Sequence, residues 1–333
     1  MLGGLLALLS AAAFAFETAT ARRGVVTASV AQALAVTVPL GVPIFLLFAA
    51  AFGGLGIIAG FSAGAIAYLA IAGILHFAWG RYCNYRATKA MGANLVAPVQ
   101  QSSLLVTLAL AIWILGEHLT PLRLIGIGLV VLGPALTYGW TRRRPSDTIA
   151  GTPIESGERW MFRPNRVEGY LFAMLSSTGY GVSPVLVRLA LEDKGLQAGL
   201  AGGLISYGAA ALALALVLLL PGQWRHVRAL DPGAAKWFVV SGVCVCFAQM
   251  LRYMALALAP VSVVTPIQRL SLVFRLYFSR IINPQHELFG GRIVAATALS
   301  LLGALALSVS TDVVQAALPL PEWARDALNW RWP

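Results

Sequence analysis

Apolar stretches of about 20 residues recur along nearly the whole chain, and this recurrence limits the possible folds more than any other feature. A helix needs about 20 apolar residues to cross the roughly 30 Å hydrocarbon core of a bilayer. The chain has 59% hydrophobic and 11% charged residues, whereas soluble domains carry roughly 25% charge. The stretches lack the alternating pattern of membrane β-strands, so their backbone groups must bond within helices. We therefore predict an all-α integral membrane protein.

The apolar stretches predict about ten transmembrane helices. We expect them near residues 2–20, 25–50, 57–90, 93–115, 121–140, 168–190, 196–220, 233–258, 261–282 and 289–311. Residues 141–167 are rich in Arg, Pro and Gly and form a polar linker. Residues 313–333 carry tryptophans among charges, which is typical of a tail at the membrane surface. The chain then divides into one five-helix unit over residues 1–140 and another over residues 168–312.

The two units are copies of one pattern. Sliding the chain by 168 residues pairs Tyr85 with Tyr253, Pro98 with Pro266, Gln100 with Gln268 and His118 with His286. Chance similarity between Leu- and Ala-rich helices does not account for such pairs. Because each copy has an odd number of helices, the second copy is inverted relative to the first, as in many secondary transporters. The alternative is a duplication that built a stable bundle without a transport role.

The net charge of +11 comes from basic residues that gather at predicted helix ends. Anionic lipid headgroups are the expected partners there, and nucleic acid is not. Most Lys and Arg, including Arg22, Arg86 and Lys89, fall in loops on one side of the predicted topology, together with the linker. The positive-inside rule therefore predicts a cytoplasmic linker and external termini, with the bacterial inner membrane as the expected location. The sequence does not predict an oligomeric state.

Residues 93–133 read ANLVAPVQQSSLLVTLALAIWILGEHLTPLRLIGIGLVVLG and resemble the end of an EamA domain of the drug/metabolite transporter superfamily. In that pattern a Pro-containing helix runs into Leu115, Gly116 and Glu117 and then into a Gly-bearing helix. Residues 259–303 look like a second copy, with Glu287 two positions off the uniform register. The resemblance implies ten helices in an inverted repeat, a central cavity and carriage of metabolites, amino acids, amines or sugar derivatives. Family members commonly keep both termini in the cytoplasm, opposite to the loop-charge prediction.

Polar side chains recur on matching helix faces of the two copies, at the i, i+3, i+4 and i+7 spacing that collects one face. The candidate substrate-binding residues on or beside these faces are Glu17, Tyr85, Gln100, Ser103, Tyr180, Arg252, Tyr253, Gln268, Arg269, Ser271 and Arg275. An Arg near the bilayer centre costs from about 2.5 to over 10 kcal/mol. Arg269 and Arg275 should therefore face a cavity or a partner, with snorkelling to headgroups as the alternative. Arg81, near a predicted helix end, is expected to snorkel.

Glu17 is a carboxylate well inside a predicted helix. It can exchange protons or bind a cation, pair with an arginine, or lie at the interface. The basic faces favour an anionic or zwitterionic substrate, held by Arg252, Arg269 or Arg275 through paired hydrogen bonds. We predict a secondary transporter that works by alternating access. A lipid-handling or scaffolding protein, whose arginines hold headgroups, is the alternative.

Catalytic motifs are absent from the sequence: it contains no HExxH, phosphate loop or GxSxG. The three cysteines, Cys83, Cys244 and Cys246, lie in apolar stretches without the spacing of a metal site. The sequence therefore predicts no enzymatic activity, no cofactor and no metal.

Overall fold

The computed structural model describes residues 2–115, 120–138, 164–191, 195–258, 264, 267–308, 311–317, 321–323 and 330. All regular structure within these ranges is helical, and they contain no β-strand. The predicted linker and most of the predicted tail lie outside the described residues, as do Glu117 and His118.

Helices fill both halves of the chain. Before the linker lie α1 (Leu2–Thr27), α2 (Val30–Thr37), α3 (Gly41–Ala51), the 3-10 helix η1 (Leu55–Gly60), α4 (Ala63–Gly73), the π-helix η2 (Ile74–Gly80), α5 (Arg81–Met91), α6 (Ala93–Gln100), α7 (Ser103–Leu115) and α8 (Pro121–Tyr138). After it lie α9 (Arg166–Leu191), α10 (Gly195–Leu218), α11 (Gln223–Arg228), α12 (Pro232–Leu258), α14 (Ser271–Ile282), α15 (Gly291–Ser308) and α16 (Thr311–Ala317).

Eight helical segments of the described chain are long and apolar enough to cross a membrane. They are Leu2–Thr27, Val30–Ala51, Ala63–Met91, Ala93–Leu110, Arg166–Leu191, Gln197–Leu218, Pro232–Arg252 and Gly291–Ser308. Pro121–Leu136 in α8 is apolar but shorter. The chain is therefore an integral, multi-pass membrane protein, and the prediction of an all-α membrane fold is confirmed to this extent.

Several predicted helices differ from the structure. The helix expected at 2–20 continues to Thr27, and the helix expected at 25–50 is divided into α2 and α3. The helix expected at 57–90 begins at Ala63, because the Ser62 hydroxyl accepts the N–H of Ala65 and caps α4 there. The helix expected at 93–115 is divided into α6 and α7 by a turn at residues 101–102. Pro98 has no N–H to continue the backbone ladder, and the Ser102 hydroxyl donates to the Val99 carbonyl at 2.7 Å.

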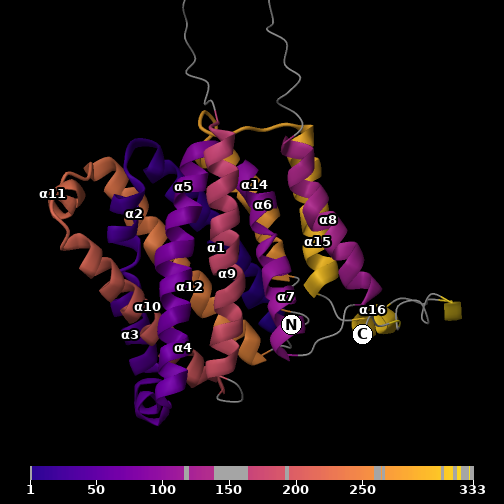
Figure 1. Ribbon diagram of the computed structural model, residues 1–333, viewed down its shortest axis with the longest axis horizontal. Helices are drawn as coiled ribbons and strands as arrows, with labels where there is room; N and C mark the ends of the chain where they lie inside the picture. The colour runs from indigo at the N-terminus through magenta and orange to yellow at the C-terminus, as the bar shows by residue number, and fades with distance from the viewer. Residues whose placement is uncertain are drawn as a thin grey trace, which may run out of the picture.

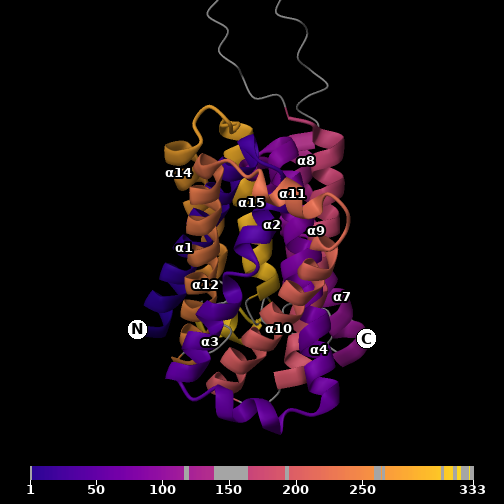
Figure 2. The same ribbon diagram turned by 90° about the vertical axis from the view of Figure 1, so that its left-hand side faces the viewer.

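The helices cross the bundle in both directions (Figure 1). The end of α8 and the start of α9 lie at one end of the bundle, which we call the linker face. The start of α1 and the end of α15 lie toward the other end, which we call the termini face (Figures 1 and 2). Helices α1 and α9, which begin the two halves, therefore run in opposite directions.

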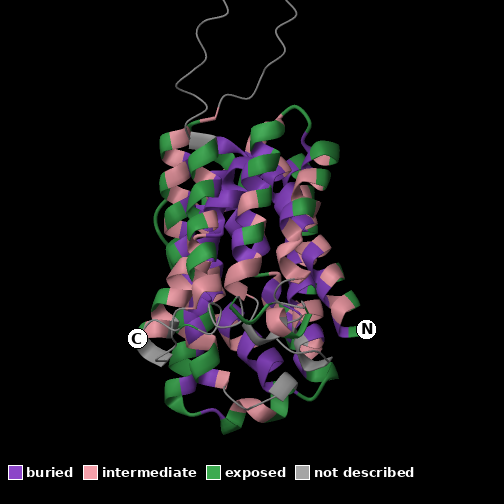
Figure 3. Cartoon of the chain, turned by 90° about the vertical axis from the view of Figure 1, so that its right-hand side faces the viewer, coloured by how far each residue is buried: buried purple, intermediate pink, exposed green. Residues whose placement is uncertain are grey.

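Helices of the two halves pack mainly against each other: α1 against α12 and α14, α5 against α9, and α8 against α15. Glycine allows the last pair to approach closely. A Cβ on Gly126 would lie 3.0 Å from the Gly303 carbonyl oxygen, and a Cβ on Gly303 would lie 2.9 Å from that of Gly126. Buried residues concentrate between the helices, and exposed apolar side chains such as Trp113 and Leu212 lie on the outside, as contact with lipid requires (Figure 3).

Candidate functional site

A buried polar cluster surrounds Glu17 in the middle of the bundle. Its Oε1 accepts hydrogen bonds from the hydroxyls of Tyr85 in α5 at 3.3 Å and Ser241 in α12 at 3.2 Å, and its Oε2 accepts one from Thr18 at 3.2 Å. Glu17 is 7% exposed, and no ion pair to it occurs within the described ranges. The carboxylate therefore lies inside the protein, held by neutral hydroxyls rather than by a directly bonded arginine.

Arg81 lies beside this carboxylate, at the start of α5. Its Nη2 donates to the Tyr207 hydroxyl at 3.1 Å, and its guanidinium lies 5.2 Å from the centre of the Phe77 ring. At 4% exposure Arg81 does not snorkel, so that prediction is wrong. The reason is tertiary packing: Tyr207 of α10 and the Phe77 ring enclose the guanidinium inside the bundle, although Arg81 lies as near the end of the span Ala63–Met91 as predicted.

Arg275 of α14 begins a chain of hydrogen bonds that reaches α5. Its Nη1 donates to the Gln100 side-chain oxygen at 3.1 Å, and the Gln100 amide nitrogen donates to Asn84 Oδ1 at 2.6 Å. The Nε of Arg275 is buried without a hydrogen-bond partner in the described part of the chain. The Tyr180 hydroxyl of α9 lies beside Asn84 and Arg81. Helices from both halves thus meet at one polar centre.

Among the described residues, arginines outnumber carboxylates at this centre. Arg81 and Arg275 both lie near Glu17, and the other acid near Arg275, Glu287, already pairs with Arg22. Uncompensated positive charge inside a bilayer is costly, so it favours water or an anion beside it. The centre therefore has the electrostatic character of an anion-binding site.

A second buried contact closes the linker face. Arg22 Nε and Glu287 Oε1 form an ion pair of 3.2 Å, and Arg22 also donates to the carbonyls of Thr88 at 2.7 Å and His286 at 2.5 Å. These bonds join α1, the end of α5 and the loop between α14 and α15. Arg22 was predicted to lie in a loop, and this is wrong because α1 continues to Thr27. Lys89, also assigned to a loop, lies in α5 and donates to the Ala28 carbonyl at 2.8 Å.

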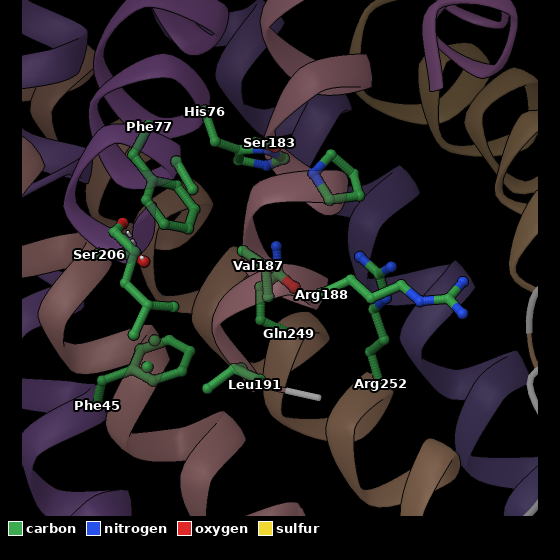
Figure 4. Close-up of a pocket in the computed structure, with 15 residues that line it drawn as sticks. Phe45, His76, Phe77, Ser183, Val187, Arg188, Leu191, Ser206, Gln249 and Arg252 are labelled. Atoms are coloured by element: carbon green, nitrogen blue, oxygen red, sulfur yellow. Dashed lines mark hydrogen bonds between the residues drawn. The ribbon is translucent and has the colours of Figure 1, made fainter. Parts of the chain in front are cut away.

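A cavity of about 260 Å³ lies beside the polar centre, between helices of both halves. Its walls come from α3, α4, η2, α9, α10 and α12. Figure 4 shows Arg188 and Arg252 on one side of it and the rings of Phe45 and Phe77 on the other. Leu191, the last residue of α9, also lines it, so the cavity extends toward the termini face.

Residues 1–139 match the model of the EamA-like transporter family. These residues form an EamA domain. The domain belongs to the drug/metabolite transporter superfamily, whose members are transporters rather than enzymes. The chain is also similar to a protein of known crystal structure, with a TM-score of 0.50, 16% sequence identity and coverage of 96% of this chain and 98% of that one. At this identity the likeness shows the fold alone. No curated protein matches the chain.

Several predicted site residues come together across the EamA domain and the second half. Glu17, Tyr85 and Gln100 of the EamA domain meet Tyr180 and Arg275 at the polar centre. Their contacts come from α1, α5 and α6 on one side and from α9 and α14 on the other.

Other predicted residues lie around this centre. Gln268 donates to the Ser10 hydroxyl at 3.1 Å, between the second half and α1. Arg252 lines the cavity. Arg269 lies close enough to Arg252 for the two positive charges to repel each other. The Nε of Arg269 is buried without a hydrogen-bond partner among the residues that the structure describes.

Ser103, Ser271 and Tyr253 are not placed at the centre by any contact in the described residues. Ser103 begins α7 after the turn that ends α6, so it does not continue the face of Gln100 as predicted. Ser271 begins α14 and makes no side-chain hydrogen bond within the described part. Tyr253 lies on α12, and its side chain lies outside the described residues.

Sequence reasoning missed Arg22, Arg81 and Ser241 as interior residues. Arg22 had a usable signal, because a slide of 166 residues, which aligns the starts of the two halves, pairs it with Arg188. A residue that only meets headgroups needs no fixed counterpart in the other copy. Ser241 had no signal, because a lone serine in an apolar helix is common and its contact with Glu17 joins residues 224 positions apart.

Proposed function

We propose that the protein is a secondary transporter that moves a small anionic or zwitterionic metabolite across the membrane by alternating access. Its ten transmembrane helices form two inverted five-helix repeats, residues 1–140 and 168–312, joined by the linker 141–167 and followed by an interfacial tail, 313–333. The antiparallel course of α1 and α9 supports this arrangement (Figure 1). In it, α8 and α14 belong to the two membrane-crossing helices that are not among the eight long spans.

The observation that carries the proposal is the excess of guanidinium groups between the two halves. Arg81, Arg275, Arg252 and Arg269 come from helices of both halves and lie inside the bundle. The neighbouring acids in the described residues are Glu17 and Glu287, and Glu287 already pairs with Arg22. Arginines at such depth mark substrate pathways in membrane proteins. A planar guanidinium binds a carboxylate or phosphate through two parallel hydrogen bonds.

The unequal sealing of the two faces supports alternating access. At the linker face, Glu287 joins Arg22 to the start of α6, and both side chains are 1% exposed. Toward the termini face, the cavity reaches the end of α9. A carrier needs a state open to one side and closed to the other, and these two features support such a state. The opposite state would require the Arg22–Glu287 contact to break.

The charge distribution supports an inner-membrane orientation with the linker in the cytoplasm. Exposed basic residues such as Arg225, Arg228 and Arg280 lie at ends of helices near the linker face, where they suit anionic headgroups. With this orientation the cavity opens to the outside. A cysteine introduced at exposed Ala229, directly after α11, should react with an impermeant maleimide only after cell lysis. Labelling of intact cells would indicate the opposite orientation.

The function is tested by reconstituting the protein in proteoliposomes and measuring uptake of organic acids, sugar phosphates, amino acids and amines. We expect uptake of at least one anionic or zwitterionic compound, and loss of that uptake in Arg269→Gln. Transfer of a fluorescent anionic phospholipid between leaflets, without solute uptake, would instead indicate a lipid-handling protein. Uptake of amines alone would contradict the charge argument.

A further inference from the structure

The cavity between α4, η2, α9, α10 and α12 has two chemically different ends. Figure 4 shows Phe45 and Phe77 at one end and the guanidinium-bearing side chains Arg188 and Arg252 at the other. The apolar end is held in place, because both phenyl rings stack on Tyr207, with centroid distances of 5.1 Å for Phe45 and 3.8 Å for Phe77. A ligand that fills the cavity therefore needs an apolar body and one polar head.

The polar end carries an arginine, Arg252, that has no acidic partner within the described residues. The guanidinium of Arg252 makes no hydrogen bond or ion pair within the described residues, and Arg269 lies close to it with a buried, unpartnered Nε. No carboxylate is found among the described residues that line the cavity. This end suits an anionic head, and the described lining offers no carboxylate to a ligand's ammonium group.

The remaining polar groups of the lining are already engaged. Ser206 donates to the Leu69 carbonyl at 2.8 Å, and His76 Nδ1 bonds to Ser183 Oγ at 2.8 Å. Gln249 remains as the neutral side chain able to meet a ligand near Arg252. A sugar body with several hydroxyls would lose its hydrogen bonds to water without replacement, which disfavours sugar phosphates.

The size of the cavity limits the ligand further. A volume of about 260 Å³ corresponds to roughly nine water molecules at about 30 Å³ each. This space fits a body with on the order of ten non-hydrogen atoms, smaller than the drug-sized ligands of typical pockets.

From these observations we propose that this cavity is the substrate site and that it selects small monocarboxylates with an aromatic or branched apolar body and no amino group. The carboxylate binds Arg252, assisted by Gln249 and the nearby Arg269, and the apolar body lies against Phe45 and Phe77. This assignment rests on the proposed transport function and narrows its substrate class.

The test is binding of 3-phenylpropionate to the purified protein in lipid nanodiscs, measured by calorimetry. Phenylalanine adds an amino group to the same skeleton, phenethylamine lacks the carboxylate, and propionate lacks the ring. We expect 3-phenylpropionate to bind at least tenfold more tightly than each of these and than glucose 6-phosphate. Equal or tighter binding of phenylalanine or glucose 6-phosphate would overturn the proposal.

Variants locate the site. Arg252→Gln should weaken 3-phenylpropionate binding at least tenfold, and Phe45→Leu should weaken it less, while Arg228→Gln on exposed α11 should leave it unchanged. If Arg252→Gln does not fold, Arg252→Lys keeps the charge and should weaken binding through loss of the paired hydrogen bonds. Unchanged binding in a folded Arg252 variant would place the ligand elsewhere.

Transport separates this inference from the proposed function. Uptake of a different anion without binding of 3-phenylpropionate would leave a transporter with another substrate class. Binding of 3-phenylpropionate at Arg252 without uptake of any solute would support the proposed site and contradict the proposed transport function.

Discussion

Arg22 of α1 and Glu287, in the loop between α14 and α15, form a buried ion pair of 3.2 Å. The same carboxylate accepts the backbone N–H groups of Ala93 at 2.6 Å and Asn94 at 3.0 Å, at the start of α6. Acidic groups are favourable at a helix N-terminus, where N–H groups lack partners. One side chain of the second half therefore holds together two helices of the EamA domain at the linker face.

Arg22→Gln should lower the free energy of unfolding by about 3–5 kcal/mol, because it leaves a buried carboxylate without its counter-charge. Chemical denaturation of the purified protein in detergent measures this change. The matched control is Arg23→Gln, one residue further along and only partly buried, with an expected change within about 0.5 kcal/mol. The double variant Arg22→Gln/Glu287→Gln should cost less than the sum of its two single variants. Strict additivity would show that the two residues do not stabilise each other.

Gly92→Ala should destabilise the protein by about 1–3 kcal/mol. Gly92 has φ +88°, which L side chains rarely adopt, and an added Cβ would lie 2.7 Å from Glu287 Oε2. The control is Gly128→Ala in α8, where a Cβ would meet no atom within 4 Å and the better helix propensity of Ala should leave stability equal or higher. Thermal unfolding of both variants gives the comparison. A Gly92→Ala protein as stable as Gly128→Ala would mean that the loop and α6 can separate freely.

The sequence predicted the membrane class and most helices, because length and apolarity are properties of single segments. It also indicated that Gln100 and Arg275 turn inward, since polar groups in lipid-exposed positions are costly. It did not predict the π-helix η2, which depends on tertiary packing: a Cβ on Gly80 would lie 2.9 Å from the Tyr180 ring, and one on Gly179 would lie 2.7 Å from the Leu75 carbonyl oxygen. Only the helices' mutual approach explains these contacts.

The assignment of Arg22 and Arg81 to membrane surfaces failed for a related reason. The loop-charge count placed Arg22 outside the helices, and nearness to a predicted helix end placed Arg81 at the headgroups. Arg22 acquires its partner from Glu287, 265 positions away, and Arg81 acquires Tyr207 from the other half. Partners at such separations are set by the fold, and no local pattern in one sequence contains them.

Glu17→Gln should lower the stability, because it removes the carboxylate beside Arg81 and Arg275. The local structure should persist, because the amide oxygen can still accept from Tyr85 and Ser241. The substitution should abolish uptake driven by a proton gradient while preserving exchange of substrate across the membrane, because the amide cannot take up a proton. Proteoliposomes with and without an imposed pH gradient measure both activities. Glu168→Gln is the control: this acid pairs with Arg86 at the protein surface, with side chains 32% and 43% exposed, and should transport normally. If Glu17→Gln retained the gradient-driven uptake of the unaltered protein, Glu17 would not be the group that couples transport to protons.

Arg275→Gln should reduce the initial rate of anion uptake by about 10–150-fold. This factor is the free energy of one hydrogen bond to a charged group, converted to a ratio of rates. Arg275 donates to Gln100, which holds Asn84, so its loss removes a positive charge and releases two amides that it orders. Arg280→Gln is the matched control on the same helix, because Arg280 is exposed and lies over the Phe289 ring. Arg275→Lys separates charge from geometry, since an ammonium keeps the charge but not the planar donor set. Full activity of Arg275→Gln in a correctly folded protein would mean that the central positive charge is structural, and that substrate selection lies with the cavity arginines alone.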